Sequence, residues 1–204
     1  MEMLNIDINV PQEIKDGVVT SLPPINDIQN PELREKVIEA WALALALNGY
    51  ERIEQIPGSG MPGAPIKGDQ TRHILGVTYI AMAMKEALEK VFNEPLGVDS
   101  DMLLAAALCH DVGKPYEYNP ENVERWKNDP RVSGSPALRH PTYGAYIAMV
   151  VGLPEEIVHV CGYHSPEGRF VRRSLSGTIV HYADDSFWFI LENALNWDGQ
   201  IPRL

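Results

Sequence analysis

The sequence has little cysteine, few basic residues and no long hydrophobic run. Its two cysteines, Cys109 and Cys161, lie within apolar helical segments, which favours reduced, buried thiols and a cytoplasmic location over a disulfide. The 17 Lys and Arg are outnumbered by 28 Asp and Glu, and a formal charge of -11 would repel a phosphate backbone, so we expect no nucleic-acid partner. The longest apolar segments, residues 40–47 and 102–109, are far shorter than the roughly 20 residues that cross a bilayer, and no export signal is visible. We therefore expect no membrane span.

The chain does have the hydrophobic period of helices. Apolar residues recur every three or four positions in several segments, and no convincing alternating pattern indicates a strand. The helices are expected over residues 31–48, 71–92, 99–109, 140–152, 154–164 and 174–195. The second of them is expected to have Thr71 as its cap, and it carries the stripe His73, Val77, Ile80, Met84, Leu88 and Val91. The first 30 residues have scattered prolines and no period, which predicts an irregular N-terminal arm before a single all-α domain over residues 31–204.

Two segments indicate loop insertions. Residues 56–70 contain four Gly and three Pro in fifteen positions, too many helix and strand breakers for a regular element. Residues 116–139 contain Pro120, Pro130 and Pro136, with one short helix expected around residues 121–127.

Polar side chains recur on the apolar faces of five of these helices. The set comprises four histidines and two aspartates: His73, His110, Asp111, His140, His164 and Asp184. An unpaired buried carboxylate costs several kcal/mol, and Lys114 is the only basic residue that could share a stripe with one of these six. Taken singly, each histidine is more often an ordinary core or surface residue. Imidazole and carboxylate are ligands that transition metals accept, and six ligands exceed one tetrahedral site, so the set predicts two divalent ions.

The order of these six residues resembles the HD-domain superfamily, helical metal-dependent phosphohydrolases named after the His-Asp doublet. The segments "HDVGKP", "HPTYGAYIA", "YHSPEG" and "IVHYADD" are similar to the corresponding parts of its dinuclear branch, and the core motifs span residues 70–187. The "GYP" signature of the cyclic-di-nucleotide branch is absent. The resemblance implies an HD-type helical bundle that holds two ions of Mn, Fe, Co, Ni or Zn.

The resemblance also implies a reaction. Asp111 would share its carboxylate between the two ions, and a metal-bound hydroxide would attack a small phosphorylated molecule or nucleotide. The remaining ligands would divide into His73, His110 and Asp184 on the first ion and His140 and His164 on the second. In "IVHYADD" Asp185 competes with Asp184, but the stripe through Val180 favours Asp184.

Several basic residues are candidates for binding the substrate. Lys114 lies one turn past His110, where it could bind a phosphate or, equally, satisfy carbonyl groups at a helix end. Arginines flank the ligands on three segments, and one or two of them could hold an anion: Arg72, Arg139, Arg169, Arg172 and Arg173.

Three other functions stay open at this point. A hydrolase of a non-phosphorylated carbon substrate, such as a ring carbonyl or an amide, would use the same metal chemistry with fewer cations. A di-iron oxygenase resembling inositol oxygenase would use the same six ligands, and a metal or ligand sensor would bind without turnover. A homodimer is also open, since no residue indicates a dimer surface.

Overall fold

A computed structural model describes residues 10–60, 64–197 and 199, and within them the all-α prediction is confirmed. The helices are α1 (Gln12–Ser21), α2 (Pro31–Leu47), α3 (Gln70–Phe92), α4 (Ser100–Cys109), α5 (Lys114–Tyr118), α6 (Pro120–Asn128), α7 (Pro130–Ser133), α8 (His140–Val150), α9 (Glu155–Tyr163) and α10 (Leu175–Leu195). Three 3-10 turns join them: η1 (Pro23–Asp27), η2 (Ile53–Gln55) and η3 (Pro166–Phe170). None of the described helices is long and apolar enough to cross a membrane.

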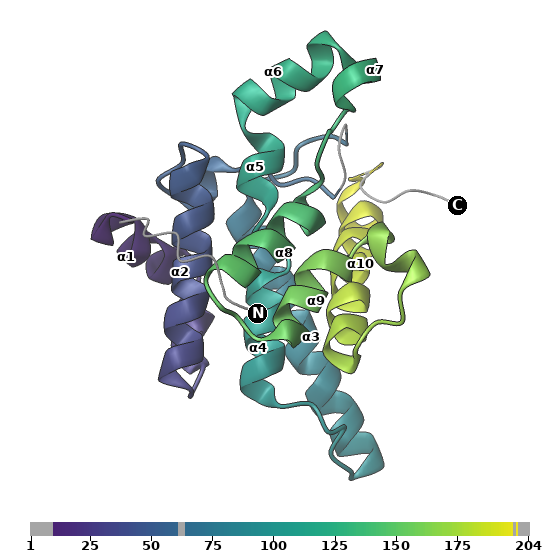
Figure 1. Cartoon of the computed structure of the whole chain (residues 1–204). Helices are drawn as coiled ribbons and strands as arrows, with labels where there is room; N and C mark the ends of the chain where they lie inside the picture. The colour runs from purple at the N-terminus through teal and green to yellow at the C-terminus, as the bar shows by residue number, and fades with distance from the viewer. Residues whose placement is uncertain (1–9, 61–63, 198, 200–204) are drawn as a thin grey trace.

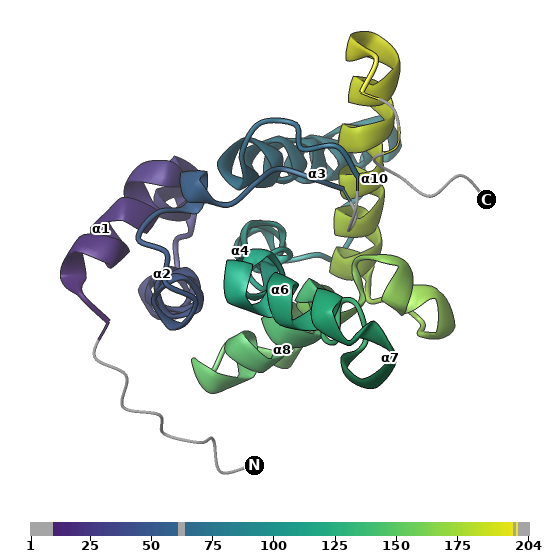
Figure 2. The same ribbon diagram turned by 90° about the horizontal axis from the view of Figure 1, so that it is seen from above.

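Helix α4 is the centre of the bundle. It contacts α2, α3, α9 and α10, and Figure 2 shows it enclosed by its neighbours. Every residue from Leu103 to Cys109 is buried, which explains why this helix is apolar on all sides rather than along one stripe. Two close helix pairs, α3 with α10 and α8 with α9, complete the core around it.

Several of the described helices begin where a side chain accepts hydrogen bonds from their free N–H groups. Asn30 accepts hydrogen bonds from the first turn of α2, and Asp99 accepts one from Met102 in α4. The cap of α3 is Asp69, which accepts from the backbone of Arg72, so the expectation that Thr71 caps this helix is wrong.

The predicted irregular conformation of the first 30 residues is wrong over most of the described part. Helix α1 and η1 occupy residues 12–27 and pack against α2 (Figure 1). Ile14 and Val18 are buried on one face of α1, and Leu22 and Ile25, which follow at helical spacing, are buried at its C-cap and in η1. The scattered prolines obscured this period, because they lie outside the helix, at its cap and in η1. Residues 1–9 lie outside the described part of the chain.

The structure modifies the expectations for the end of α3 and for the insertion at residues 116–139. The predicted stripe of α3 holds in its first half, but Leu88 and Val91 are 45% and 75% exposed because the end of α3 extends past the other helices (Figure 1). The insertion at 116–139 contains α6, as expected, together with most of α5 and the short α7. The single domain over residues 31–204 stays a proposal.

Candidate metal centre

The end of α4 is held in place by hydrogen bonds to its last carbonyl groups, which have no partner in their own helix. Trp41 of α2 donates from Nε1 to the carbonyl of Leu108 at 2.9 Å. The imidazole of His110 lies with Nδ1 2.6 Å from the carbonyl oxygen of Ala107. These bonds fix where the chain leaves α4 and therefore where the His-Asp doublet is presented.

A close backbone contact places the next ligand helix. A Cβ atom on Gly113 would lie 2.0 Å from the carbonyl oxygen of His140 and 2.6 Å from the backbone nitrogen of Gly144. Only glycine permits this approach, because a side chain there would collide with backbone atoms of α8. The start of α8 thus lies directly against the doublet.

The structure brings the six predicted metal-binding side chains into one cluster. They come from α3, the turn after α4, the start of α8, the end of α9 and the middle of α10. Five of them are buried, and the side chain of Asp184 is 16% exposed. Two overlapping groups of donor atoms lie within the reach of an ion: His73, His110 and Asp184, and His110, Asp111 and His164.

Asp111 lies at the centre of the cluster with its two oxygens facing different histidines. Oδ2 lies 3.2 Å from Nε2 of His73 and 3.7 Å from Nε2 of His110. Oδ1 lies 3.1 Å from Nε2 of His140 and 3.5 Å from Nε2 of His164. One carboxylate therefore separates two pairs of imidazoles.

The "ADD" segment presents one aspartate to the cluster. Oδ1 of Asp184 lies 3.3 Å from Nε2 of His73. The neighbouring Asp185 is instead 3.8 Å from His181 and is 39% exposed. The geometry agrees with the choice of Asp184, and its role as a ligand stays a prediction.

The hydrogen-bond partners of Nδ1 in three imidazoles show which ring nitrogen carries the proton. Nδ1 of His110 faces a backbone carbonyl, and Nδ1 of His140 lies 2.7 Å from a carboxylate oxygen of Glu117. Nδ1 of His164 lies 3.1 Å from two backbone carbonyls. Because these oxygens accept hydrogen bonds, Nδ1 carries the proton in each ring, and Nε2 directs a lone pair towards the oxygens of Asp111. Lone pairs facing a carboxylate repel unless a cation lies between them, so the residues fit divalent transition-metal ions.

The ionisation states of His110 and Asp111 agree with this arrangement, whereas that of His164 reflects the attraction of the central carboxylate for positive charge. Burial lowers the pKa of His110 to about 4, which keeps the ring neutral as a ligand must be. Burial would raise the pKa of Asp111, but Lys114 and the surrounding imidazoles hold it well below its usual range. At His164 burial opposes the charged ring, yet Asp111 outweighs it and raises the pKa. The carboxylate at the centre therefore attracts positive charge.

His73 is held differently from the other three rings. Among the described residues its Nδ1 has no hydrogen-bond partner. The ring instead stacks on Trp188, with centroids 4.9 Å apart and planes at 24°, and meets the edge of Phe187. Aromatic packing, rather than a hydrogen bond, orients this imidazole.

Glu117 is the main functional residue that the sequence analysis missed. Its side chain is 5% exposed, accepts from His140, and lies 2.8 Å from Nε of Arg139 and 3.6 Å from Nζ of Lys114. Burial would raise the pKa of Glu117, but His140 and Lys114 outweigh it and keep the carboxylate ionised. Its position three residues after Lys114, on the same side of a helix, was the available signal.

Gln70 was also missed. It is fully buried, and its amide donates to Oδ2 of Asp111. Its position one turn before His73 places both side chains on the inner face of α3.

The predicted substrate-binding residues have different surroundings. Lys114 is 1% exposed, and its ammonium group donates to the backbone carbonyl of Ser59 at 3.3 Å. Arg139 is paired with Glu117, whereas Arg72 has an 81% exposed side chain and Arg169 is exposed. Their contact with a substrate stays a prediction.

Comparison with known proteins places the chain in a family. The family model "HD domain" matches residues 71–186. The chain is 29% identical over 166 residues to "Dihydroneopterin 2',3'-cyclic phosphate phosphodiesterase" of Methanocaldococcus jannaschii, an alignment that covers 78% of this chain and 64% of the relative. The chain thus spans less than two thirds of that protein's length, and no solved structure gives a significant match. The family match covers more than half of the sequence and contains all six clustered residues, so the chain belongs to the HD domain family.

Proposed function

We propose that the chain is a metal-dependent phosphohydrolase that acts on a small phosphorylated molecule. Membership of the HD domain family supports the hydrolase class, and the similarity to a phosphodiesterase supports a phosphate ester as the bond that is cleaved. The observation that carries the proposal is the position of Asp111, whose two oxygens face two separate pairs of imidazole nitrogens.

The cluster would hold two ions, taken from Mn, Fe, Co, Ni and Zn. One oxygen of Asp111 would join the first group, with His73, His110 and Asp184, and the other oxygen would join His140 and His164. When bound, such ions polarise a phosphoryl oxygen and activate water. Glu117 would keep the Nδ1 proton of His140 in place, so that Nε2 stays available as a ligand.

Lys114 is the group of this chain best suited to bind the phosphate. Burial disfavours its charged form, but Asp111 and Glu117 outweigh this and raise the pKa of Lys114, so the ammonium group stays protonated. An ammonium group has three N–H donors, of which one is directed to Ser59 and one lies towards Glu117. We propose that the third binds a phosphate oxygen, with Arg139, Arg72 and Arg169 as further contacts.

The test combines metal analysis with a substrate panel. Purified protein is stripped of metal, reloaded under anaerobic conditions with each of the five ions, and assayed with bis-p-nitrophenyl phosphate and 2',3'-cyclic nucleotides. Phosphate-ester cleavage that depends on the added ion supports the proposal. Bound metal with no phosphate-ester cleavage by any form would overturn it, and oxygen uptake by the iron form alone would favour the oxygenase.

The cellular location and the oligomeric state of the protein are also proposals. Cys109 and Cys161 are both free and buried, which supports a reducing, cytoplasmic location. A homodimer stays a prediction without a surface to support it.

A further inference from the structure

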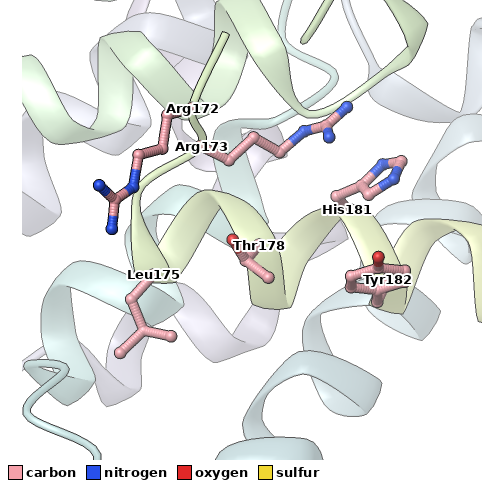
Figure 3. A pocket seen from close by; sticks show the side chains of 6 residues that line it. All are labelled: Arg172, Arg173, Leu175, Thr178, His181 and Tyr182. Atoms are coloured by element: carbon pink, nitrogen blue, oxygen red, sulfur yellow. The ribbon is translucent and has the colours of Figure 1, made fainter. Parts of the chain in front are cut away.

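A hollow on the outer side of α10 carries an unusual concentration of positive charge. It has a volume of about 470 Å³ and lies where the segment before α10 crosses that helix (Figure 3). Its lining residues are Arg172, Arg173, Leu175, Thr178, His181 and Tyr182. None of them is acidic, in a chain whose net charge is -11. Asp185, at the edge, is 3.8 Å from His181, and a single half-exposed carboxylate does not balance two guanidinium groups.

The two arginines keep donors available for a ligand. Arg172 is exposed, and within the described part of the chain neither arginine has a carboxylate within ion-pair distance, although Asp185 lies close enough for the charge of Arg173 to act on it. Arg173 uses Nε and one terminal nitrogen for bonds to the protein, and a guanidinium group has five N–H donors in all. Figure 3 shows the two side chains extending in opposite directions, that of Arg173 towards His181 and that of Arg172 away from it.

The backbone of residues 163–165 separates this hollow from the metal centre. Arg173 donates to the carbonyl oxygens of Tyr163 at 2.7 Å and Ser165 at 3.0 Å. His181 donates from Nδ1 to the carbonyl oxygen of His164 at 2.6 Å. Three consecutive carbonyl groups therefore point towards the hollow, while the imidazole of His164 points the other way, towards Asp111. None of the six clustered residues lines the hollow.

We propose that this hollow binds a small phosphate-bearing molecule at a site separate from the metal centre. Guanidinium groups match the geometry of phosphate oxygens, and the exposed ring of Tyr182, with 58% of the residue accessible, offers a flat surface for an aromatic ring. The volume is that of an ordinary small-molecule site. An occupant contacts Arg173 and His181, whose side chains hold the backbone of residues 163–165. Because this backbone positions His164, the site is suited to an effector rather than to a substrate.

The experiment adds candidate ligands stepwise and follows the NMR signal of the His181 imidazole. The chain has six histidines, so the imidazole signals in a carbon-proton NMR spectrum are few, and His181 is assigned from its loss in His181→Gln. AMP, inorganic phosphate and adenosine are added separately to metal-free protein. We expect AMP and phosphate to shift the His181 signal saturably, AMP to bind more tightly, and adenosine alone to bind weakly.

Matched variants localise the effect. Arg172→Gln removes an exposed arginine from the hollow and should weaken AMP binding roughly tenfold or more. Arg125→Gln removes an exposed arginine from α6 and should leave binding unchanged. Asp111→Ala should keep the AMP-induced shift, because the hollow does not include the metal centre.

Two results would overturn the proposal. One is a His181 signal that neither AMP nor phosphate moves, or that moves equally in Arg172→Gln and the parent protein. The other is loss of the shift in a folded Asp111→Ala variant, which would assign the phosphate to the metal centre. The proposed hydrolase activity is measured separately by metal-dependent cleavage, so either idea can fail alone.

Discussion

Replacing Glu117 by Gln tests whether the carboxylate behind His140 organises the metal centre. Glutamine has nearly the same volume as glutamate but no charge. It leaves the buried ammonium group of Lys114 and the guanidinium group of Arg139 without their shared partner, and it no longer guarantees an acceptor for Nδ1 of His140. The substitution therefore changes charge and hydrogen bonding with little change in packing.

The expected magnitudes follow from burial. Removing one partner of a buried ion pair costs about 3 to 5 kcal/mol, and we expect about 3 kcal/mol here because Arg139 is 27% exposed and also lies 3.6 Å from Glu167. Removing the hydrogen-bond partner of a metal-binding histidine weakens metal affinity by about 10- to 100-fold. The loss of stability should lower the midpoint of urea unfolding by roughly 1 to 2 M for a slope near 2 kcal/mol/M.

The assay is competition for Mn²⁺ or Zn²⁺ against a chelating dye, alongside urea unfolding. Glu167→Gln is the matched control, because Glu167 also approaches Arg139 but is 31% exposed and accepts its hydrogen bond from Ser165, whereas Glu117 accepts from His140. The control should lose less than about 1 kcal/mol and keep the Kd for metal. If Glu117→Gln binds metal as tightly as Glu167→Gln, the proposed role of Glu117 is wrong.

Three further predictions use the same protein. Asp111→Ala should abolish bound metal and activity together, whereas Asp185→Ala should keep near-normal metal content by elemental analysis; equal losses would contradict the ligand assignment in "ADD". Gly113→Ala should reduce the free energy of unfolding by about 1 to 3 kcal/mol, since its Cβ would meet the backbone of α8, and an unchanged melting curve would contradict this contact. Burial raises the pKa of the Cys161 thiol to about 12, so only about one molecule in ten thousand carries the thiolate at pH 8, and iodoacetamide should label it in urea but not in the folded protein.

Local pattern was sufficient to predict most helices and all six clustered residues. The spacing of His140 and His164 relative to their apolar neighbours placed each on an inner face, because one helical turn returns a side chain to the same side. The same rule applies to Ile14 and Val18 in α1, where the prolines before and after the helix obscure the period.

Other features of the site had no local signal. The packing of Trp188 on His73 joins α10 to α3, more than a hundred residues apart in the chain. The carbonyl of Ser59 reaches Lys114 from a loop that the sequence marked only as irregular. Such contacts depend on how helices cross, which the period of a single helix does not specify.

By itself the sequence determined an all-α chain of the HD type, with imidazole and carboxylate side chains on buried helix faces, because helical period and ligand chemistry are properties of short segments. Only the tertiary structure decided how the two oxygens of Asp111 are divided between the histidines, and that Glu117 is ionised beside Lys114 and Arg139. These features arise where separate helices meet, since the direction of a carboxylate and the charge it carries depend on every neighbour within a few ångströms.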